Sequence, residues 1–258
     1  MAHKILVMSP LHNVGSSTVS LMLSQGLTYD GKSTTLLFTQ TGSLVPRYIG
    51  IEDVKDPTRS VMQIVKLIDN GAINDSDIID YAYQYTKNGW MLNASDESMA
   101  DKDREQVIKH VYSRVTTDVV ICDNSEDITS PITSELLSES DLLFIVIDMS
   151  TKARERLQKW LESPVLKDFK DIYIIVNNYN EVVSSVRNYA KVLKLPANRV
   201  CKLHYNPWIT KCTAVGQLHT ILPLSKELDP RVCNLNCDIN ELSQCVNGAM
   251  ILKIKKGF

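Results

Sequence analysis

Short runs of consecutive apolar residues alternate along this chain with longer stretches in which apolar positions recur at helical spacing. The apolar runs predict strands buried on both faces, at residues 4–9, 34–38, 118–123, 142–148, 172–177 and 200–203. The stretches between them predict helices at residues 17–27, 58–70, 102–115, 131–139, 151–161 and 181–193. This alternation is typical of a three-layer α/β fold, a mostly parallel sheet with helices on both faces. Because no linker or repeat interrupts it, we expect one domain over residues 1–258.

Two segments depart from the alternation. In residues 70–100, spaced tyrosines precede Gly89 and Trp90, and we interpret this segment as a helix and a short exposed connection. The basic and apolar residues 249–258 favour a last edge strand or a frayed end. The alternative is an amphipathic segment that docks on a membrane, which needs a longer apolar face than this tail offers.

The composition limits the class of protein. Apolar residues make up 44% of the chain, enough for a full core, and the net charge of −2 predicts no broad basic surface for nucleic acid. The sequence shows no leader and no apolar run of membrane-spanning length, so we expect a cytoplasmic protein whose cysteines are thiols. Cys233, Cys237 and Cys245 form a cluster without the paired C-x-x-C spacing of zinc sites, and we interpret them as thiols too.

The first strand runs into a loop that resembles a phosphate-binding loop. Such a loop needs a glycine close to the phosphates, converging backbone N–H groups and a hydroxyl for Mg²⁺ at the start of the helix. Gly15 and Ser17 supply the glycine and the magnesium hydroxyl, but Ser16 stands where the phosphate-binding lysine belongs. The residues expected to hold phosphate are Asn13, Val14, Gly15, Ser16, Ser17 and Thr18.

Polar residues follow three of the later strands. Asp123 ends an apolar strand and either holds Mg²⁺ opposite Ser17 or is an ordinary acid at a strand end. Asn177 either bonds the edge of a nucleotide base or forms a turn or helix cap. Pro207 lies in a segment that either packs beside the base or is only a turn.

The order of these pieces resembles the ParA/MinD group of deviant Walker A ATPases over roughly residues 1–225. The group's loop reads K-G-G-x-G-K-[ST]-T, and residues 11–18 here read L-H-N-V-G-S-S-T. Its D-Y-I-I-I-D strand is matched by residues 118–123, its adenine-contacting Asn by Asn177, and its late Y-[DN]-P segment by residues 205–207. The resemblance implies a P-loop NTPase fold, a bound ATP or ADP with Mg²⁺, and a homodimer.

Three departures from that pattern fall on groups that the resemblance associates with hydrolysis. Ser16 replaces the lysine on the β- and γ-phosphates, Leu11 replaces the lysine that crosses the dimer, and Thr39 replaces an acid associated with water and magnesium. Because removing one such electrostatic group costs roughly 10²–10³ in rate, we expect weak or absent hydrolysis.

The loop also resembles the TadZ/CpaE-like proteins of Tad-type pilus assembly. That resemblance implies a nucleotide-responsive localisation or assembly scaffold, with a protein of a pilus or secretion machine as partner. One alternative is an active ParA-like ATPase in DNA partitioning or positioning, which takes its cation from Lys32, Arg47 or a partner. The other is a structural pseudo-ATPase that binds no nucleotide.

Overall fold

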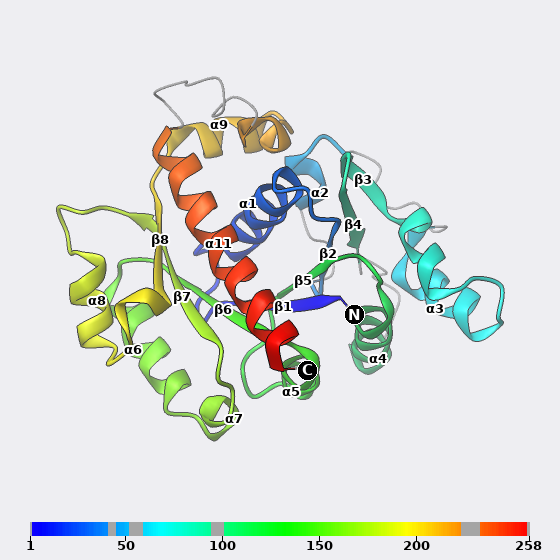
Figure 1. Ribbon diagram of the computed structural model, residues 1–258, viewed down its shortest axis with the longest axis horizontal. Helices are drawn as coiled ribbons and strands as arrows, with labels where there is room; N and C mark the ends of the chain where they lie inside the picture. The colour runs from blue at the N-terminus through cyan, green and yellow to red at the C-terminus, as the bar shows by residue number, and fades with distance from the viewer. Residues whose placement is uncertain (1, 41–44, 52–58, 94–100, 223–232, 257–258) are drawn as a thin grey trace.

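Eight strands form one sheet in the order β3-β4-β2-β5-β1-β6-β7-β8, shown in Figure 1. The computed structural model describes residues 2–40, 45–51, 59–93, 101–222 and 233–256. Neighbouring strands are parallel except for the antiparallel pair β3 and β4, which confirms the predicted mostly parallel sheet. The strands are β1 His3–Met8, β2 Thr34–Phe38, β3 Tyr83–Thr86, β4 Gly89–Asn93, β5 Val119–Asn124, β6 Leu142–Ile147, β7 Ile172–Tyr179 and β8 Val200–His204.

Helices cover both faces of this sheet, as predicted. The α-helices are α1 Ser16–Tyr29, α2 Val45–Tyr48, α3 Val61–Asp69, α4 Asp101–Arg114, α5 Pro131–Glu139, α6 Thr151–Leu161, α7 Pro164–Lys167, α8 Val186–Val192, α9 Pro207–Ala214 and α11 Cys233–Lys256. Successive side chains of β1 alternate between two core clusters. Ile5 and Val7 pack with apolar residues of α1 and α11, whereas Leu6 and Met8 pack with those of α3 to α8.

The region around residues 70–93 differs from the sequence prediction. A 3₁₀ helix, Asp75–Tyr81, leads into the hairpin of β3 and β4. The predicted short exposed connection is wrong, because Met91 and Leu92 are fully buried and β4 pairs with β2. The two strands are only four and five residues long, too short for their alternation to be recognised, and their burial depends on a partner far along the chain.

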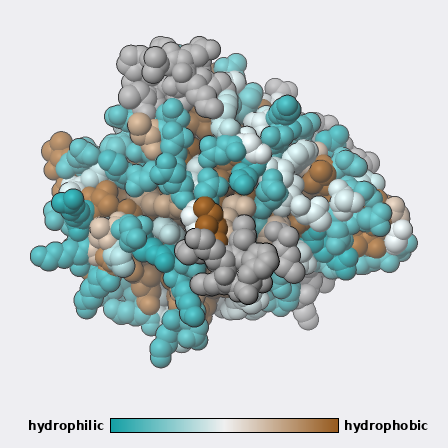
Figure 2. Space-filling model, viewed as in Figure 1, coloured by the Kyte–Doolittle hydropathy of each residue, from teal (hydrophilic) through white to brown (hydrophobic). Residues whose placement is uncertain are grey.

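The C-terminal segment is also different from the sequence prediction. Residues 249–256 belong to the long helix α11, so the favoured edge strand or frayed end is wrong for them. The buried residues Leu235, Ile239, Leu242 and Val246 are spaced four, three and four apart, which is the helical period. This period is visible only when the whole segment is considered. The face of the molecule that carries α11 in Figure 1 is mostly hydrophilic, with scattered apolar groups, in Figure 2.

The carboxyl ends of β1, β2, β5, β6, β7 and β8 all lie at one edge of the sheet, because these strands are parallel. β1 lies between β5 and β6, so the chain leaves β1 for one half of the sheet and later returns to build the other half. Ligands of open α/β sheets bind at such a switch point. Among the described residues, no helix combines the length and apolar character needed to span a bilayer.

Candidate functional site

The loop between β1 and α1 is a tight turn built from local bonds and two left-handed residues. The Ser9 hydroxyl donates to the Leu11 carbonyl at 2.7 Å and accepts from the Leu11 N–H at 3.1 Å. Asn13 has φ of 62° and Gly15 has φ of 89°. Asparagine and glycine are the residues that adopt this conformation most readily. The sequence therefore turns the chain sharply just before α1 begins.

The N-terminus of α1 is open toward the end of this loop. Gly15 is the N-cap of the helix, and no side chain caps it. The first N–H groups of a helix have no partner within it, and the helix dipole adds positive potential there. The first N–H that bonds back is that of Val19, which donates to the Gly15 carbonyl at 2.9 Å. The N–H groups of Ser16, Ser17 and Thr18 precede this bond, and N–H groups at such a helix start are suited to bind an anion.

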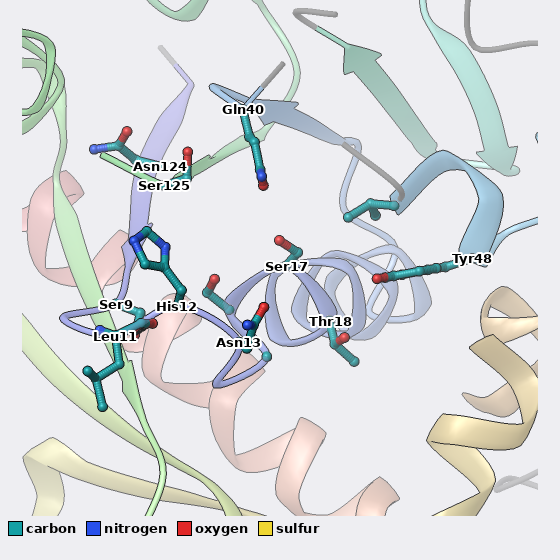
Figure 3. Close-up of a pocket in the computed structure, with 13 residues that line it drawn as sticks. Ser9, Leu11, His12, Asn13, Ser17, Thr18, Gln40, Tyr48, Asn124 and Ser125 are labelled. Atoms are coloured by element: carbon teal, nitrogen blue, oxygen red, sulfur yellow. Dashed lines mark hydrogen bonds between the residues drawn. The ribbon is translucent and has the colours of Figure 1, made fainter. Parts of the chain in front are cut away.

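A cleft of about 480 Å³ lies in front of these N–H groups, as shown in Figure 3. Ser17 and Thr18 reach it from α1, His12 from the loop and Gln40 from the end of β2. None of the described residues that line it is lysine or arginine. The described lining residues are Ser9, Leu11, His12, Asn13, Gly15, Ser16, Ser17, Thr18, Gln40, Val45, Tyr48, Asn124 and Ser125.

Five of the six residues predicted to hold phosphate line this cleft, and Val14 does not. The Val14 side chain is buried in the core cluster with α1 and α11. Its carbonyl accepts a hydrogen bond of 2.7 Å from Nδ2 of Asn177, which is itself only 7% exposed. A Cβ on Gly15 would lie 2.5 Å from the same Nδ2, so only glycine fits there without movement. Asn177 therefore supports the loop from β7, and its contact with a base stays a prediction.

Asp123 lies at the end of β5, beside the N-terminus of α1. The Ser17 hydroxyl donates to Oδ2 of Asp123 at 2.5 Å, so the structure brings together the two residues predicted to hold Mg²⁺. Asp123 is 5% exposed. Burial raises the pKa of Asp123 to about 6, although the hydrogen bond from Ser17 acts in the opposite direction. The carboxylate is therefore shielded from water, and the hydrogen bonds that it accepts from serines of α1 offset only part of the cost of burial.

Thr39 occupies the position of the missing acid and belongs to a polar network that the sequence did not predict. Its hydroxyl donates to Oδ1 of Asn124 at 3.0 Å and accepts from the N–H of Ser125 at 3.1 Å. Nδ2 of Asn124 in turn donates to the Thr133 hydroxyl at 2.8 Å. Thr39, just after β2, thus links that strand to the end of β5 and to Ser125, and it contributes no carboxylate to the cleft.

Pro207 is the first residue of α9 and is exposed at the surface. It does not line the cleft, and its contact with a base stays a prediction. The preceding Asn206 caps α9 by accepting from the Trp208 N–H at 2.9 Å. At the other end of α9, a Cβ on Gly216 would lie 3.1 Å from the Arg47 carbonyl, so α9 packs closely against α2. The segment predicted as a possible turn is therefore a capped helix.

The structure also shows which cations lie near the loop. Arg156 of α6, which the sequence did not single out, donates from Nη1 to the Pro10 carbonyl at 3.0 Å. Lys32 follows the C-terminal end of α1. At 1.5 Å per residue, the helix places it about 20 Å from its own loop, so it is excluded as a replacement cation within one chain.

The fold can be compared with solved structures. MinD in the MinC:MinD cell division complex of Aquifex aeolicus superposes with a TM-score of 0.71, at 17% identity over 96% of both chains. The ParA family ATPase of Chlorobium tepidum gives 0.70, at 15% identity over 95% of this chain and 99% of that one. The chain has the fold of the MinD and ParA ATPases.

A third structure, MinD from Pyrococcus horikoshii complexed with Mg-ADP, gives a TM-score of 0.67 at 15% identity over 94% of this chain and 95% of that one. No family model and no curated protein matches the sequence. The MinD/ParA-like fold thus persists at identities of 15–17%. The fold class expected from the sequence is confirmed, and the roles of individual residues depend on the geometry described above.

Proposed function

We propose that this chain is a nucleotide-binding protein of the MinD/ParA type that holds ATP or ADP with Mg²⁺ and hydrolyses it weakly or not at all. The observation that carries the proposal is the open N-terminus of α1, with the Ser17 hydroxyl 2.5 Å from the buried carboxylate of Asp123. The MinD of Pyrococcus horikoshii with the same fold was solved with Mg-ADP.

The residues present fit a polyphosphate. The N–H groups of Ser16, Ser17 and Thr18 supply donors, and the left-handed Gly15 leaves room for a close approach. The Asn13 side chain and the His12 ring are further donors at the cleft. Asn177 and the packing of Val14 hold the loop in place before any ligand arrives. Such preorganisation reduces the entropy lost on binding.

The donor set at Ser17 and Asp123 also fits Mg²⁺, which prefers oxygen ligands and often binds one or two carboxylates plus phosphate oxygens. A bound divalent cation supplies the positive charge that the ionised, buried Asp123 lacks. Ser17 and Asp123 come from different elements, α1 and β5, and the described sheet pairs β5 directly with β1. The site is therefore fixed by the fold rather than by one flexible loop.

Weak hydrolysis follows from what the cleft lacks. No lysine or arginine is among its described lining residues, Leu11 offers only an apolar side chain, and Thr39 is engaged with Asn124. Cations aimed at the phosphoryl group stabilise the charge that develops in the transition state, and one such group is worth roughly 10²–10³ in rate. Binding depends mainly on backbone N–H groups, which remain.

We propose a role as a localisation or assembly scaffold in the cytoplasm, in which the bound nucleotide biases a homodimer that a partner protein recognises. The loop resembles that of the TadZ/CpaE-like proteins, so we propose a Tad-type pilus or secretion system as the machine that the scaffold serves. The Aquifex MinD with this fold was solved in complex with MinC, which supports a protein partner in general terms. A peripheral contact of the C-terminal segment with a membrane remains part of the proposal only as an alternative.

One observation favours an active ATPase as the second candidate. Arg156 already lies against the loop through its 3.0 Å bond to Pro10 and carries a permanent charge. A partner or a second copy that releases this bond would free a cation next to the phosphates. That candidate extends to DNA partitioning, where a local basic patch would replace the broad basic surface that the composition lacks.

The test is a calorimetric titration of the full chain with ATP, in Mg²⁺ and in EDTA. We expect saturable binding that is tighter in Mg²⁺, and loss of this difference in Ser17→Ala. Ser134→Ala, at an exposed position of α5, is the matched control and should bind like the natural chain. No binding at millimolar Mg-ATP would leave the structural pseudo-ATPase as the answer. Steady phosphate release that Arg156→Ala abolishes would favour the second candidate.

A further inference from the structure

Helix α11 is fastened to the outer strand β8 at two places (Figure 1). Asp238 accepts from both the N–H and Nδ1 of His204, each at 2.8 Å. Two turns further along the helix, Sγ of Cys245 lies 3.6 Å from Sγ of Cys201. Seven helical residues rise about 10 Å and three strand residues rise about 10 Å. The helix therefore runs antiparallel to β8 in a matched register that holds both contacts at once.

The two cysteines differ in accessibility. Cys201 is on β8 and 2% exposed, whereas Cys245 is partly exposed on α11. Both are free thiols in van der Waals contact. A disulfide needs a sulfur separation of about 2.05 Å, which is about 1.5 Å less than the present distance and within reach of small side-chain rotations. Cys245 is thus the more accessible residue of the pair, and the buried Cys201 lies in contact with it.

The surroundings favour the thiolate on the accessible residue. The hydrogen bond from Cys201 lowers the pKa of Cys245, and the nearby Arg199 guanidinium acts in the same direction, against burial and the Glu241 carboxylate. The same hydrogen bond and burial raise the pKa of Cys201. Arg199 is held in place by Asp171 at 3.0 Å and by the ring of Tyr173 at 4.5 Å. Thiolates at accessible positions near a cation are the ones that react.

We propose that Cys245 and Cys201 are a redox-active thiol pair that hydrogen peroxide converts into an intramolecular disulfide linking α11 to β8. The Cys245 thiolate attacks one peroxide oxygen, the O–O bond breaks, and the departing hydroxide takes up a proton to become water, leaving a sulfenic acid on Cys245. Cys201 loses its proton and attacks Sγ of Cys245; the S–S bond forms, the S–O bond breaks, and a second water leaves. The two sulfurs lose two electrons in total, and the peroxide gains them.

The disulfide would fix a helix that packs against the C-terminal half of α1. α11 packs against α1, whose N-terminus is the proposed anion site, through Ile239 and Ser243. The fit is close, because a Cβ on Gly26 of α1 would lie 2.5 Å from Cγ2 of Ile239. Oxidation at β8 thus holds α11 against α1 as well. The disulfide would close a loop that runs from Cys201 to Cys245. For a loop of that length, we expect the oxidised chain to melt about 5–10 °C higher than the reduced chain.

The test treats the reduced full chain with stoichiometric hydrogen peroxide and maps its peptides without reductant. Cleavage after Lys, Arg and Glu releases Cys201 in residues 200–202 and Cys245 in residues 242–253, each as the single cysteine of its peptide. We expect these two peptides cross-linked, with two hydrogens lost, and the link reversed by dithiothreitol. Cys212→Ser, which removes a buried thiol outside the pair, should give the same product.

A second arm separates chemistry from mere proximity. In Cys201→Ser the sulfenic acid on Cys245 has no thiol to resolve it, so a dione reagent should label Cys245 in this variant and far less in the natural chain. Peptide 242–253 that stays reduced, or that cross-links to a different cysteine, would overturn the proposal. The peptide map of the natural chain decides this even if the variant does not fold.

Discussion

Asp123 is deeply buried and is also a ligand of the proposed metal site. Replacing it distinguishes the effect of its buried charge on stability from its effect on metal binding. The pKa of Asp123 rises from its ordinary 3.8 to about 6 because of burial. At about 1.36 kcal/mol per unit, ionisation in the metal-free fold costs about 3 kcal/mol relative to the unfolded chain. The amide introduced by Asp123→Asn carries no charge and still accepts from Ser17. At pH 7.5 in EDTA, we expect the free energy of unfolding of this variant to be up to about 3 kcal/mol higher than that of the natural chain.

The pH dependence gives the sign of this effect. The folded state binds the Asp123 proton more tightly than the unfolded state does. The free-energy cost of ionising Asp123 in the folded state is therefore absent below about pH 4, and it grows as the pH rises from there to about 6. Urea unfolding at pH 4 and pH 7.5 should therefore show a gain for Asp123→Asn only at the higher pH. Asp118→Asn is the control with opposite sign, because hydrogen bonds from Ser33 lower the pKa of Asp118.

The same variant should lose the metal. We expect Mg²⁺ to raise the affinity of the natural chain for ATP and to leave the affinity of Asp123→Asn unchanged in a calorimetric titration. A variant that is less stable than the natural chain at pH 7.5, or equally altered at both pH values, would refute the electrostatic reasoning. A variant that keeps its magnesium dependence would refute the assignment of Asp123 as a ligand.

Three further predictions concern the loop. Gly15→Ala and Gly31→Ala both place an alanine at positive φ, which costs about 1–2 kcal/mol of strain. Only Gly15→Ala also brings a Cβ too close to Asn177, so thermal melts should show the larger loss of stability for Gly15→Ala. Equal losses of stability would contradict the contact. Ser16→Lys restores the missing cation, so phosphate release should rise by up to roughly 10²–10³, and an unchanged rate would show that this lysine is not what limits hydrolysis. Asn177→Ala leaves the Val14 carbonyl without its donor, which should lower the free energy of unfolding by about 1–3 kcal/mol in urea. If Asn177 acts only by supporting the loop, its replacement should weaken the binding of ATP and of GTP alike. A loss of affinity confined to ATP would support the contact with the base.

The elements recognisable from sequence are those whose pattern is local and long. The buried strand predicted at residues 4–9 and the turn residues before Ser17 are evident within twenty positions. The hairpin of β3 and β4 is not, because its short strands become a buried unit only by pairing with β2. Its Tyr85 hydroxyl is hydrogen-bonded to Ser24 of α1, which lies 61 positions earlier in the chain.

The candidate site shows the same division. The proximity of Ser17 and Asp123 follows from a helix start and a strand end at one edge of a parallel sheet, and that much is predictable. The engagement of Thr39 with Asn124 is not, because nothing in the residue type distinguishes a free hydroxyl from a bonded one. The support of the loop by Asn177 and the bond from Arg156 to Pro10 join residues more than a hundred positions apart.

In the proposed metal site, the hydrogen bond between Ser17 and Asp123 would make magnesium binding an exchange rather than a simple addition. The two candidate ligands are hydrogen-bonded to each other at 2.5 Å. A cation that takes the Ser17 oxygen must turn its hydrogen away from the carboxylate, which forfeits a charge-assisted bond worth about 1.5–3 kcal/mol. That loss lowers the affinity for free Mg²⁺ about tenfold to a hundredfold. A cation carried by a polyphosphate offsets the same loss through the contacts of its phosphates with the protein. The proposed site would therefore bind free Mg²⁺ weakly and would take up the cation together with the nucleotide.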